Sequence, residues 1–195
     1  MPRKPRILEP NRVHHVFNRR TDCQLLFPSP RAYDDFLRLM QKGREKYAVR
    51  ICTYCLMDTH WHQAIWVGDP KNATQVAHYL RWLSASHALR FRRRSDTRGH
   101  GHVYQDRYKS IPVENDAHYL TLMRYIEANP LTAGLVDRAE RWPWSGLADR
   151  LSGRRRIICD GPVPLPTDWT EIVNARGECA EIAAIDEIVA CEGRR

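Results

Sequence analysis

The stretch YAVRICTYCLMDTHWHQAIWV (residues 47–67) contains two strand-like segments that lie very close together in the chain. Residues 47–56 and 60–67 are rich in β-branched and aromatic side chains, which is typical of strands. Because the short connection between them leaves no room for a crossover, the two strands must be antiparallel neighbours. An antiparallel sheet is therefore the centre of the expected fold.

Further strand and helix patterns extend on both sides of this hairpin. Residues 12–19 predict a first strand, and residues 102–113 predict a further extended segment. Apolar side chains recur at helical spacing in three segments, residues 30–46, 72–92 and 115–129. Pro130 is expected to end the last helix. This element order predicts an α+β fold, a ferredoxin-like antiparallel sheet sandwiched by helices.

The composition changes after residue 151. The segment SGRRRIICDGPVPLP, which starts at residue 152, has three prolines within five residues. We therefore expect a main domain over residues 1–151 and a C-terminal appendage over residues 152–195. The appendage should carry one short helix near residues 178–191 and contribute little to the core.

The charge balance favours a polyanionic partner. The chain has 31 Lys and Arg against 23 Asp and Glu, a formal net charge of +8. Such a surplus suits nucleic acid, although a merely soluble basic protein is the alternative. No run of 18 apolar residues predicts a membrane span, and the basic N-terminus precedes no apolar segment typical of a secretory signal. We therefore expect a cytoplasmic protein with no membrane partner.

His60, Trp61 and His62 open the second strand of the hairpin. Residues i and i+2 of a strand point to the same face, with Cα atoms roughly 6.5–7 Å apart. Two imidazoles at this spacing can share one divalent ion, while Trp61 points to the other face. The alternative is a surface strand that happens to carry two histidines.

The helix expected over residues 115–129 could complete such a site. Its apolar stripe consists of Tyr119, Leu122, Met123 and Ile126. Tyr125 lies about 100° from this stripe, and Asn129 follows one turn later. A hydroxyl nucleophile and a carboxamide ligand on successive turns make a workable arrangement. The alternatives are a tyrosine at the rim of the core and an Asn-Pro pair that ends the helix.

The six cysteines are scattered, and free thiols are expected. Cys52 and Cys55 form a lone CxxC within a predicted strand, where residues three apart point to opposite faces. No second pair completes four zinc ligands. Structural zinc is therefore not expected.

Four segments in this order, YCLMDTHWHQAIWV, YQDRYKSIPV, RYIEANPLTAGLV and WPWSG, carry a family resemblance. In order and spacing they resemble the REP-associated tyrosine transposases, which are relatives of the small insertion-sequence transposases in the HUH endonuclease superfamily. The resemblance covers roughly residues 12–148. HUH denotes His, a bulky apolar residue and His, which His60-Trp61-His62 fits.

The resemblance implies the HUH single-tyrosine nuclease fold and a role for each matching residue. His60 and His62 would bind Mg²⁺ or Mn²⁺, Asn129 would complete the metal site, and Tyr125 would be the nucleophile. The activity implied is metal-dependent cleavage and transfer of single-stranded hairpin DNA through a 5′-phosphotyrosine, as in DNA transposition. Imidazole suits Mn²⁺ better than Mg²⁺, so the metal stays open. Tyr108 is the rival nucleophile.

The chain departs from the family pattern at three places. Asp58-Thr59 replaces the frequent Pro-Asn, Arg20 follows Asn18-Arg19 where Gly is usual, and Tyr104 stands where Trp is common. These departures bear on substrate recognition more than on chemistry. The alternative function is a domesticated protein that binds hairpin DNA with little or no cleavage.

Basic residues are the expected DNA contacts. These are Arg19, Arg92, Arg93, Arg94, Arg98, Arg107 and Lys109. Arg107 and Lys109 would share one strand face, whereas the residues of the basic loop could simply be solvated. No role is assigned to His14, His15, His100 and His102, which could add ligands or phosphate contacts. The resemblance implies a monomer, with a dimer as the alternative.

Overall fold

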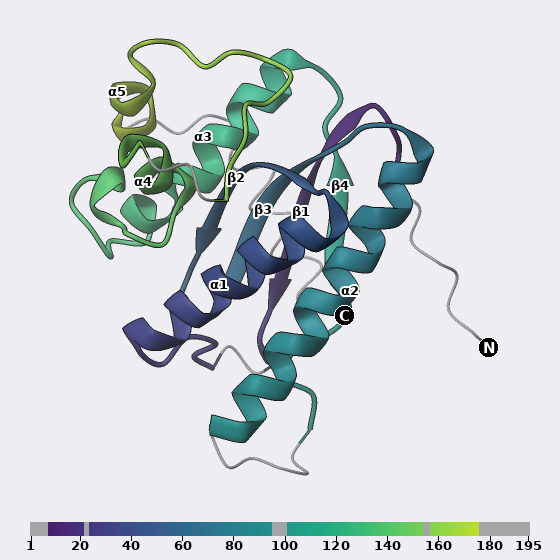
Figure 1. Cartoon of the computed structure of the whole chain (residues 1–195). Coiled ribbons are helices and arrows are strands. Elements are labelled where there is room, and N and C mark those ends of the chain that lie inside the picture. The colour runs from purple at the N-terminus through teal and green to yellow at the C-terminus, as the bar shows by residue number, and fades with distance from the viewer. Residues whose placement is uncertain (1–7, 22–23, 95–100, 154–156, 176–195) are drawn as a thin grey trace.

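Four strands form one antiparallel sheet in the order β2-β3-β1-β4. The computed structural model describes residues 8–21, 24–94, 101–153 and 157–175 (Figure 1). The strands are β1 (Arg12–Arg19), β2 (Arg50–Leu56), β3 (His60–Val67) and β4 (Lys109–Pro112). The helices are α1 (Pro30–Tyr47), α2 (Pro70–Arg94), α3 (Asp116–Thr132), α4 (Gly146–Leu151) and α5 (Trp169–Asn174), with a short 3-10 helix η2 (Ala139–Arg141).

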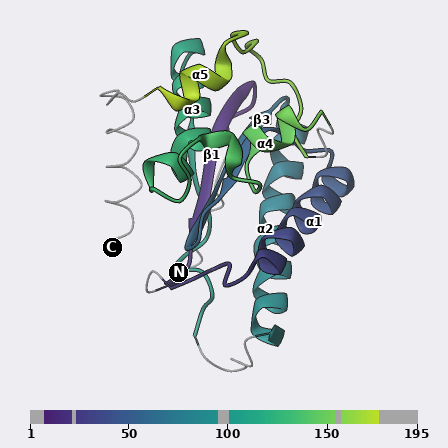
Figure 2. The same cartoon turned by 90° about the vertical axis from the view of Figure 1, so that its left-hand side faces the viewer.

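Helices cover both faces of the sheet. Helices α1 and α2 lie on one face and α3 lies on the other, as the two views in Figures 1 and 2 show together. The Phe36 ring of α1 packs 5.9 Å from the Trp61 ring of β3, measured between centroids. On the opposite face, the Thr53 hydroxyl of β2 donates to Glu127 of α3. The predicted α+β sheet sandwiched by helices is confirmed.

Helices α1 and α2 approach each other closely at Gly43. A Cβ atom at this position would lie 2.7 Å from the Tyr79 ring and 2.8 Å from the Trp82 ring. Helix α1 ends at Ala48, whose φ of 49° is left-handed. Strand β2 therefore begins at Arg50, three residues later than predicted.

Helix α3 continues through Pro130, so the prediction that this proline ends the helix is wrong. Pro130 lies inside the helix, which ends at Thr132. The end is set by Gly134, whose φ is 69° and whose N–H donates to the Leu131 carbonyl. Buried residues on several sides of α3 show that packing outweighs the lost backbone hydrogen bond.

The extended segment predicted over residues 102–113 is only partly a strand. Strand β4 covers Lys109–Pro112, and Tyr104 forms an isolated bridge with Arg20. The Tyr104 hydroxyl accepts a hydrogen bond from Trp61 Nε1 (3.3 Å) and lies 2.8 Å from His87 Nδ1. The buried Tyr104 side chain thus connects the segment before β4 to β3 and α2.

Residues 157–175 pack into the core, contrary to the expected small contribution. Ile157, Ile158, Trp169 and Val173 are buried against the main domain. The Trp169 indole donates to the buried Glu127 carboxylate of α3 (2.7 Å). The helix predicted near residues 178–191 lies outside the described residues.

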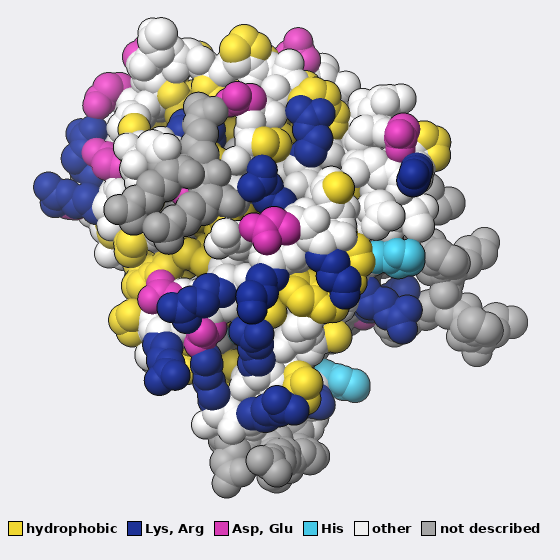
Figure 3. Space-filling view, viewed as in Figure 1, with side chains coloured by type: hydrophobic (Ala, Val, Ile, Leu, Met, Phe, Trp, Pro, Cys, Tyr) yellow, Lys and Arg dark blue, Asp and Glu magenta, His cyan; other side chains and the backbone are white. Residues whose placement is uncertain are grey.

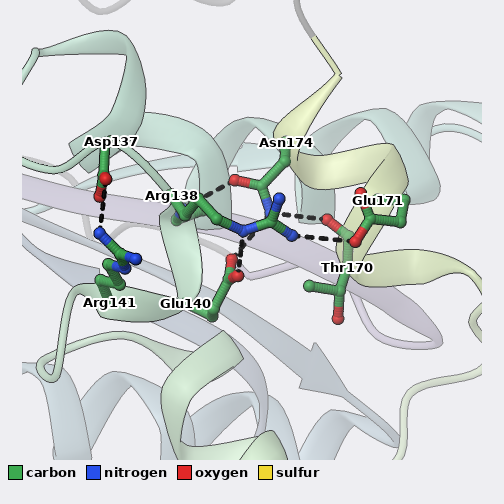
Figure 4. Close-up of polar contacts among 8 residues, drawn as sticks. Asp137, Arg138, Glu140, Arg141, Thr170, Glu171 and Asn174 are labelled. Carbon is green, nitrogen blue, oxygen red and sulfur yellow. Dashed lines mark hydrogen bonds and ion pairs between the residues drawn. The ribbon is translucent and has the colours of Figure 1, made fainter.

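A polar network fixes α5 to the segment around η2 (Figure 4). Arg138 is paired with Glu140 (2.5 Å) and Glu171 (2.9 Å). The Asn174 side chain accepts from the Ala139 N–H and donates to Glu140, at 2.9 and 2.8 Å. Within the described part of the chain, no helix is both long and apolar enough to cross a membrane.

Candidate active site

His60 and His62 lie on the face of the sheet that α3 covers. In the register of β3 with β1, His62 lies opposite Phe17 and His60 lies opposite Arg19. The two imidazole rings are 4.8 Å apart between centroids and nearly perpendicular. Trp61 points to the other face and is fully buried. The strand therefore places the two histidines side by side, as their spacing predicts.

His15 of β1 joins this pair. Its Nε2 atom lies 2.9 Å from His62 Nδ1 within the core. The rings of His15 and His62 are stacked with centroids 5.1 Å apart. The sequence places His15 within the predicted first strand. The register between β1 and β3, which brings His15 to His62, cannot be predicted from residue spacing alone.

The two HUH histidines fit a divalent metal ion. His62 Nε2 is buried and has no hydrogen-bond partner among the described residues, while its Nδ1 is held by His15. His60 Nδ1 is likewise held by the Thr59 hydroxyl at 3.0 Å. A lone pair on His62 Nε2 requires that His62 Nδ1–H donates to His15 Nε2.

Burial keeps these imidazoles neutral, which is the form that binds metals. It lowers the pKa of His60 to about 4, with the Arg19 guanidinium as a smaller cause. It lowers the pKa of His15 to about 3 and that of His62 well below its ordinary value. Metal binding near neutral pH would therefore not require these histidines to release a proton.

Tyr125 of α3 lies directly beside the histidines. Its ring centroid is 5.7 Å from that of His62 and 5.8 Å from that of His15, in edge-on contacts of 86° and 76°. Tyr125 is 5% exposed, so it is more buried than its position beside the apolar stripe suggests. The rival Tyr108 is partly buried next to β4. Of the described tyrosines, Tyr125 is the one in ring contact with the HUH histidines.

Asn129 follows Tyr125 by one turn and is partly exposed. Its carboxamide makes no hydrogen bond to His60 or His62 in the described structure. In the same residues, no three His, Cys, Asp or Glu side chains are arranged to hold a metal ion. A third protein ligand beside His60 and His62 would thus have to be of another type, and a carboxamide oxygen such as that of Asn129 is suitable.

Glu127 anchors the helix that carries Tyr125, and the sequence reasoning missed it. This fully buried carboxylate accepts from Thr53 (2.6 Å), Arg150 (2.9 Å) and Trp169 (2.7 Å). These donors come from β2, α4 and α5, respectively. A single acidic residue within an otherwise apolar helix turn is the signal that could have revealed a buried partner.

The predicted DNA contacts fall into two groups. Arg19 and Lys109 lie on the same sheet face as the HUH pair, opposite His60 and Phe17 in register. Arg107 precedes β4, so it does not share a strand face with Lys109 as predicted. It is exposed, and its peptide N–H donates to Asp106.

The second group lies at the end of α2. Arg93 is exposed, Arg92 donates to the Gly101 carbonyl (2.7 Å), and Arg94 pairs with Asp35 of α1. Arg98 lies outside the described residues, as does His100. His14 binds Ser110 and the Glu9 carbonyl on the other face of the sheet, and His102 is exposed.

The surface formed by α1 and α2 is strongly basic. These two helices carry eleven Lys and Arg against three Asp and Glu, so their surplus equals the formal net charge of the whole chain. Figure 3 shows many of these cations gathered on one side of the molecule. We call the surface of α1 and α2 the basic face. It lies on the opposite side of the sheet from Tyr125.

Comparisons with known proteins agree with this geometry. The model of the family "Transposase IS200 like" matches residues 10–129, which include His15, the HUH pair, Tyr125 and Asn129. A search of curated proteins gives no match. A solved structure described as a REP-associated tyrosine transposase bound to a REP hairpin has 18% sequence identity and a TM-score of 0.58. The match covers 86% of this chain and 96% of that one.

The family match spans more than half of the chain and contains the HUH histidine pair and the tyrosine beside it. The structural match extends the same fold beyond the family segment. This chain therefore belongs to the IS200-like transposase family.

Proposed function

We propose that this protein is a metal-dependent endonuclease and strand transferase that acts on single-stranded hairpin DNA through Tyr125. One observation carries the proposal: a tyrosine ring contacts a neutral HUH histidine whose buried Nε2 atom has no hydrogen-bond partner within the part of the chain that the structure describes. Membership of a transposase family supports it. The similar structure bound to a REP hairpin supports hairpin DNA as the substrate.

Each residue of the site has a distinct part in this proposal. His60 and His62 would hold a divalent ion, Mg²⁺ or Mn²⁺, and Asn129 would add a carboxamide oxygen from the next turn of α3. When bound, the ion polarises the scissile phosphate and stabilises the charge that develops on it. His15 is hydrogen-bonded to His62 Nδ1, which fixes the orientation of the His62 ring and leaves its Nε2 as the nitrogen that would bind the ion.

The chemical step is a transesterification at phosphorus. The Tyr125 hydroxyl oxygen forms a bond to the scissile phosphorus while the bond from phosphorus to the 3′ oxygen breaks. The tyrosine gives up its proton to solvent, and the departing 3′ oxygen takes one up. The products are a 5′-phosphotyrosine and a free 3′-hydroxyl. Attack by another 3′-hydroxyl reverses the step and transfers the strand.

The basic residues hold the DNA. Arg19 and Lys109 lie on the catalytic face of the sheet and are placed to contact phosphates near the scissile bond. Contacts to the rest of the DNA backbone come from the basic face, which includes Arg92, Arg93 and Arg94. Arg98 and Arg107 supply further contacts of this kind. We propose a monomer as the active unit, because the Tyr125 ring of a chain can contact the His62 ring of the same chain.

A cleavage assay tests this proposal. The protein is incubated with 5′- and 3′-labelled single-stranded hairpins from repeats near its own gene, with Mn²⁺ or Mg²⁺. Wild type should form a covalent protein–DNA adduct that requires the metal. Tyr125→Phe and His60→Ala should both abolish the adduct, whereas the matched control Tyr108→Phe should retain it.

Two other outcomes would contradict the proposal in different ways. Tight hairpin binding without an adduct under any metal would favour the domesticated DNA-binding protein. An adduct that survives Tyr125→Phe would assign the nucleophile elsewhere, first to Tyr108.

A further inference from the structure

Two cysteines that are far apart in the sequence meet where the C-terminal segment returns to the sheet. Ile51 of β2 and Ile158 form an isolated parallel bridge, and the Cys159 N–H donates to the Ile51 carbonyl at 2.8 Å. Paired residues of neighbouring strands lie roughly 5 Å apart and point to the same side. Cys52 and Cys159 each follow this bridge directly, and their two thiols share a hydrogen bond, which places the sulfur atoms close to each other.

The surroundings leave one of the two thiols accessible and the other enclosed. Cys52 is fully buried, whereas Cys159 is partly exposed. A Cβ atom at Gly161 would lie 3.4 Å from Cys52 Sγ and would overlap the Tyr119 hydroxyl, so both groups border this small space. A soluble oxidant therefore reaches Cys159 first, and Cys52 lies behind it.

The protonation of the pair suits this order of reaction. A hydrogen bond with Cys52 lowers the pKa of Cys159 to about 6, and Arg50 and Arg44 lower it further against the effect of burial. The same hydrogen bond, together with burial, raises the pKa of Cys52 well above its ordinary value. Near neutral pH, Cys159 is therefore mainly the thiolate and Cys52 keeps its proton. The thiolate is the nucleophilic form of a cysteine.

Cys55, the other cysteine of β2, offers a contrast within the same strand. It is fully buried, and its thiol lies 3.6 Å from the Met57 sulfur. Burial raises its pKa well above the ordinary value. No described cysteine other than Cys159 combines partial exposure with a lowered pKa.

We propose that Cys52 and Cys159 are a redox-active thiol pair that a peroxide converts to an intramolecular disulfide. The Cys159 thiolate attacks one oxygen of hydrogen peroxide and becomes a sulfenic acid, with hydroxide as the leaving group. Cys52 then attacks that sulfur, so that an S–S bond forms and water leaves. Two thiols lose two electrons, and the peroxide gains them. The bond ties β2 to the C-terminal segment whose Trp169 contacts Glu127 of α3.

Peptide mapping tests the pairing in the full-length chain. Cys23, Cys179 and Cys191 are replaced by Ser so that only the three described cysteines can react. The protein is treated with hydrogen peroxide, alkylated with N-ethylmaleimide, and digested without reduction. A linked peptide containing Cys52 and Cys159 should appear, and the intact mass should fall by about 2 Da because two thiol hydrogens leave.

Two matched variants and a melting curve complete the test. Cys159→Ser should abolish the linked peptide, whereas Cys55→Ser should retain it. Oxidation should raise Tm by roughly 5–10 °C, reversibly with dithiothreitol, because the bond closes a loop of over a hundred residues. Alkylation of reduced Cys159 should reach half its maximal rate near pH 6.

Three results would overturn the proposal. These are a Cys52–Cys55 link, overoxidised Cys159 beside free Cys52, and no reaction of Cys159 under conditions that oxidise a model thiol. Each is read from the protein that keeps Cys52, Cys55 and Cys159, so the conclusion does not depend on whether the Cys159→Ser or Cys55→Ser variant folds. The activity of Tyr125 does not enter the measurement.

Discussion

At the scale of single residues, the decisive feature is a chain of contacts from His15 through His62 to Tyr125. The hydrogen bond of His15 occupies Nδ1 of His62 and leaves Nε2 as the free nitrogen. A metal-binding histidine whose second nitrogen is held in this way keeps one tautomer and one ring orientation. In the proposed site, His15 would therefore act as a positioning residue, a role that was not assigned to it from the sequence.

His15→Gln should weaken Mn²⁺ binding about 10- to 100-fold, because the hydrogen bond that orients His62 is altered. Isothermal titration with Mn²⁺ in the absence of DNA measures this directly. His14→Gln is the matched control, since His14 points to the other face and binds Ser110. Unchanged Mn²⁺ affinity in His15→Gln, with the fold intact by circular dichroism, would remove His15 from the site.

Glu127 is the second residue whose role is specific. Loss of this carboxylate leaves Arg150, only 16% exposed, without its counter-charge, and leaves two further donors without an acceptor. Glu127→Ala should therefore lower the free energy of unfolding by about 3–5 kcal/mol. Trp169→Phe, which removes one donor, should cost about 1–3 kcal/mol. Urea denaturation measures both values.

Glu171→Gln provides the control for this comparison. Glu171 also pairs with an arginine, but its side chain is 71% exposed. Exposed ion pairs contribute little, so the cost should be at most about 1 kcal/mol. A similar cost for Glu127→Ala would show that the buried cluster does not hold α3 in place.

At the scale of elements, α2 combines packing and charge. One side of the helix buries Val76, Tyr79, Leu80 and Leu83 against the sheet and α1, and its last turn carries three consecutive arginines. The contacts of these arginines differ. Arg94 is paired with Asp35, and Arg93 is exposed. Arg93 is thus the member of this turn best placed to gain a phosphate contact.

Arg93→Gln should weaken hairpin binding similarly for all sequences and lower the slope of log K against log salt by about 1. Fluorescence anisotropy with labelled hairpins at several salt concentrations gives the slope. Arg141→Gln is the matched control, since Arg141 is also exposed but pairs with Asp137 beside η2 (Figure 4). An equal decrease of the slope of log K against log salt in both variants would show that only net charge matters and that Arg93 makes no specific phosphate contact.

Several elements follow from the sequence, and the exceptions have physical causes. The hairpin of β2 and β3 and the spacing of the HUH pair depend on local periodicity, which a sequence shows directly, whereas the placement of Tyr125 beside the pair was expected only from the family resemblance. Helix α3 passes Pro130 because tertiary packing on several sides compensates for one missing hydrogen bond. The contacts of His15 and Trp169 depend on strand register and on chain segments over 40 residues away, which spacing alone does not encode.

At the scale of the whole molecule, several histidines are enclosed in the core as neutral groups. His87 is a useful reporter because it lies on α2, away from the HUH pair, among Phe27, Phe36 and Tyr104. Burial lowers its pKa to about 3, with smaller contributions from Arg94 and Arg90. An unfolded chain binds a proton at this position near pH 6.5, whereas the folded chain does not.

The protein should therefore lose stability as the pH falls below about 6.5, by about 1.4 kcal/mol per pH unit for each such histidine. The effect should be absent above pH 7 and continue toward pH 3 for His87. Urea denaturation between pH 7 and 5 avoids most carboxylate titration. His87→Gln should reduce the slope by about one proton. Equal slopes in the wild-type protein and in His87→Gln would contradict the role of His87.

The basic face has a consequence for how the molecule meets any charged surface. Since α1 and α2 hold the entire formal surplus, the rest of the chain carries equal numbers of acidic and basic residues. The uneven charge distribution should therefore orient the protein, with the basic face toward an anionic support, before contact is made. On a cation-exchange resin it should adsorb with α1 and α2 toward the matrix. Immobilised in this way, it would leave the opposite side, with α3, open to the solution.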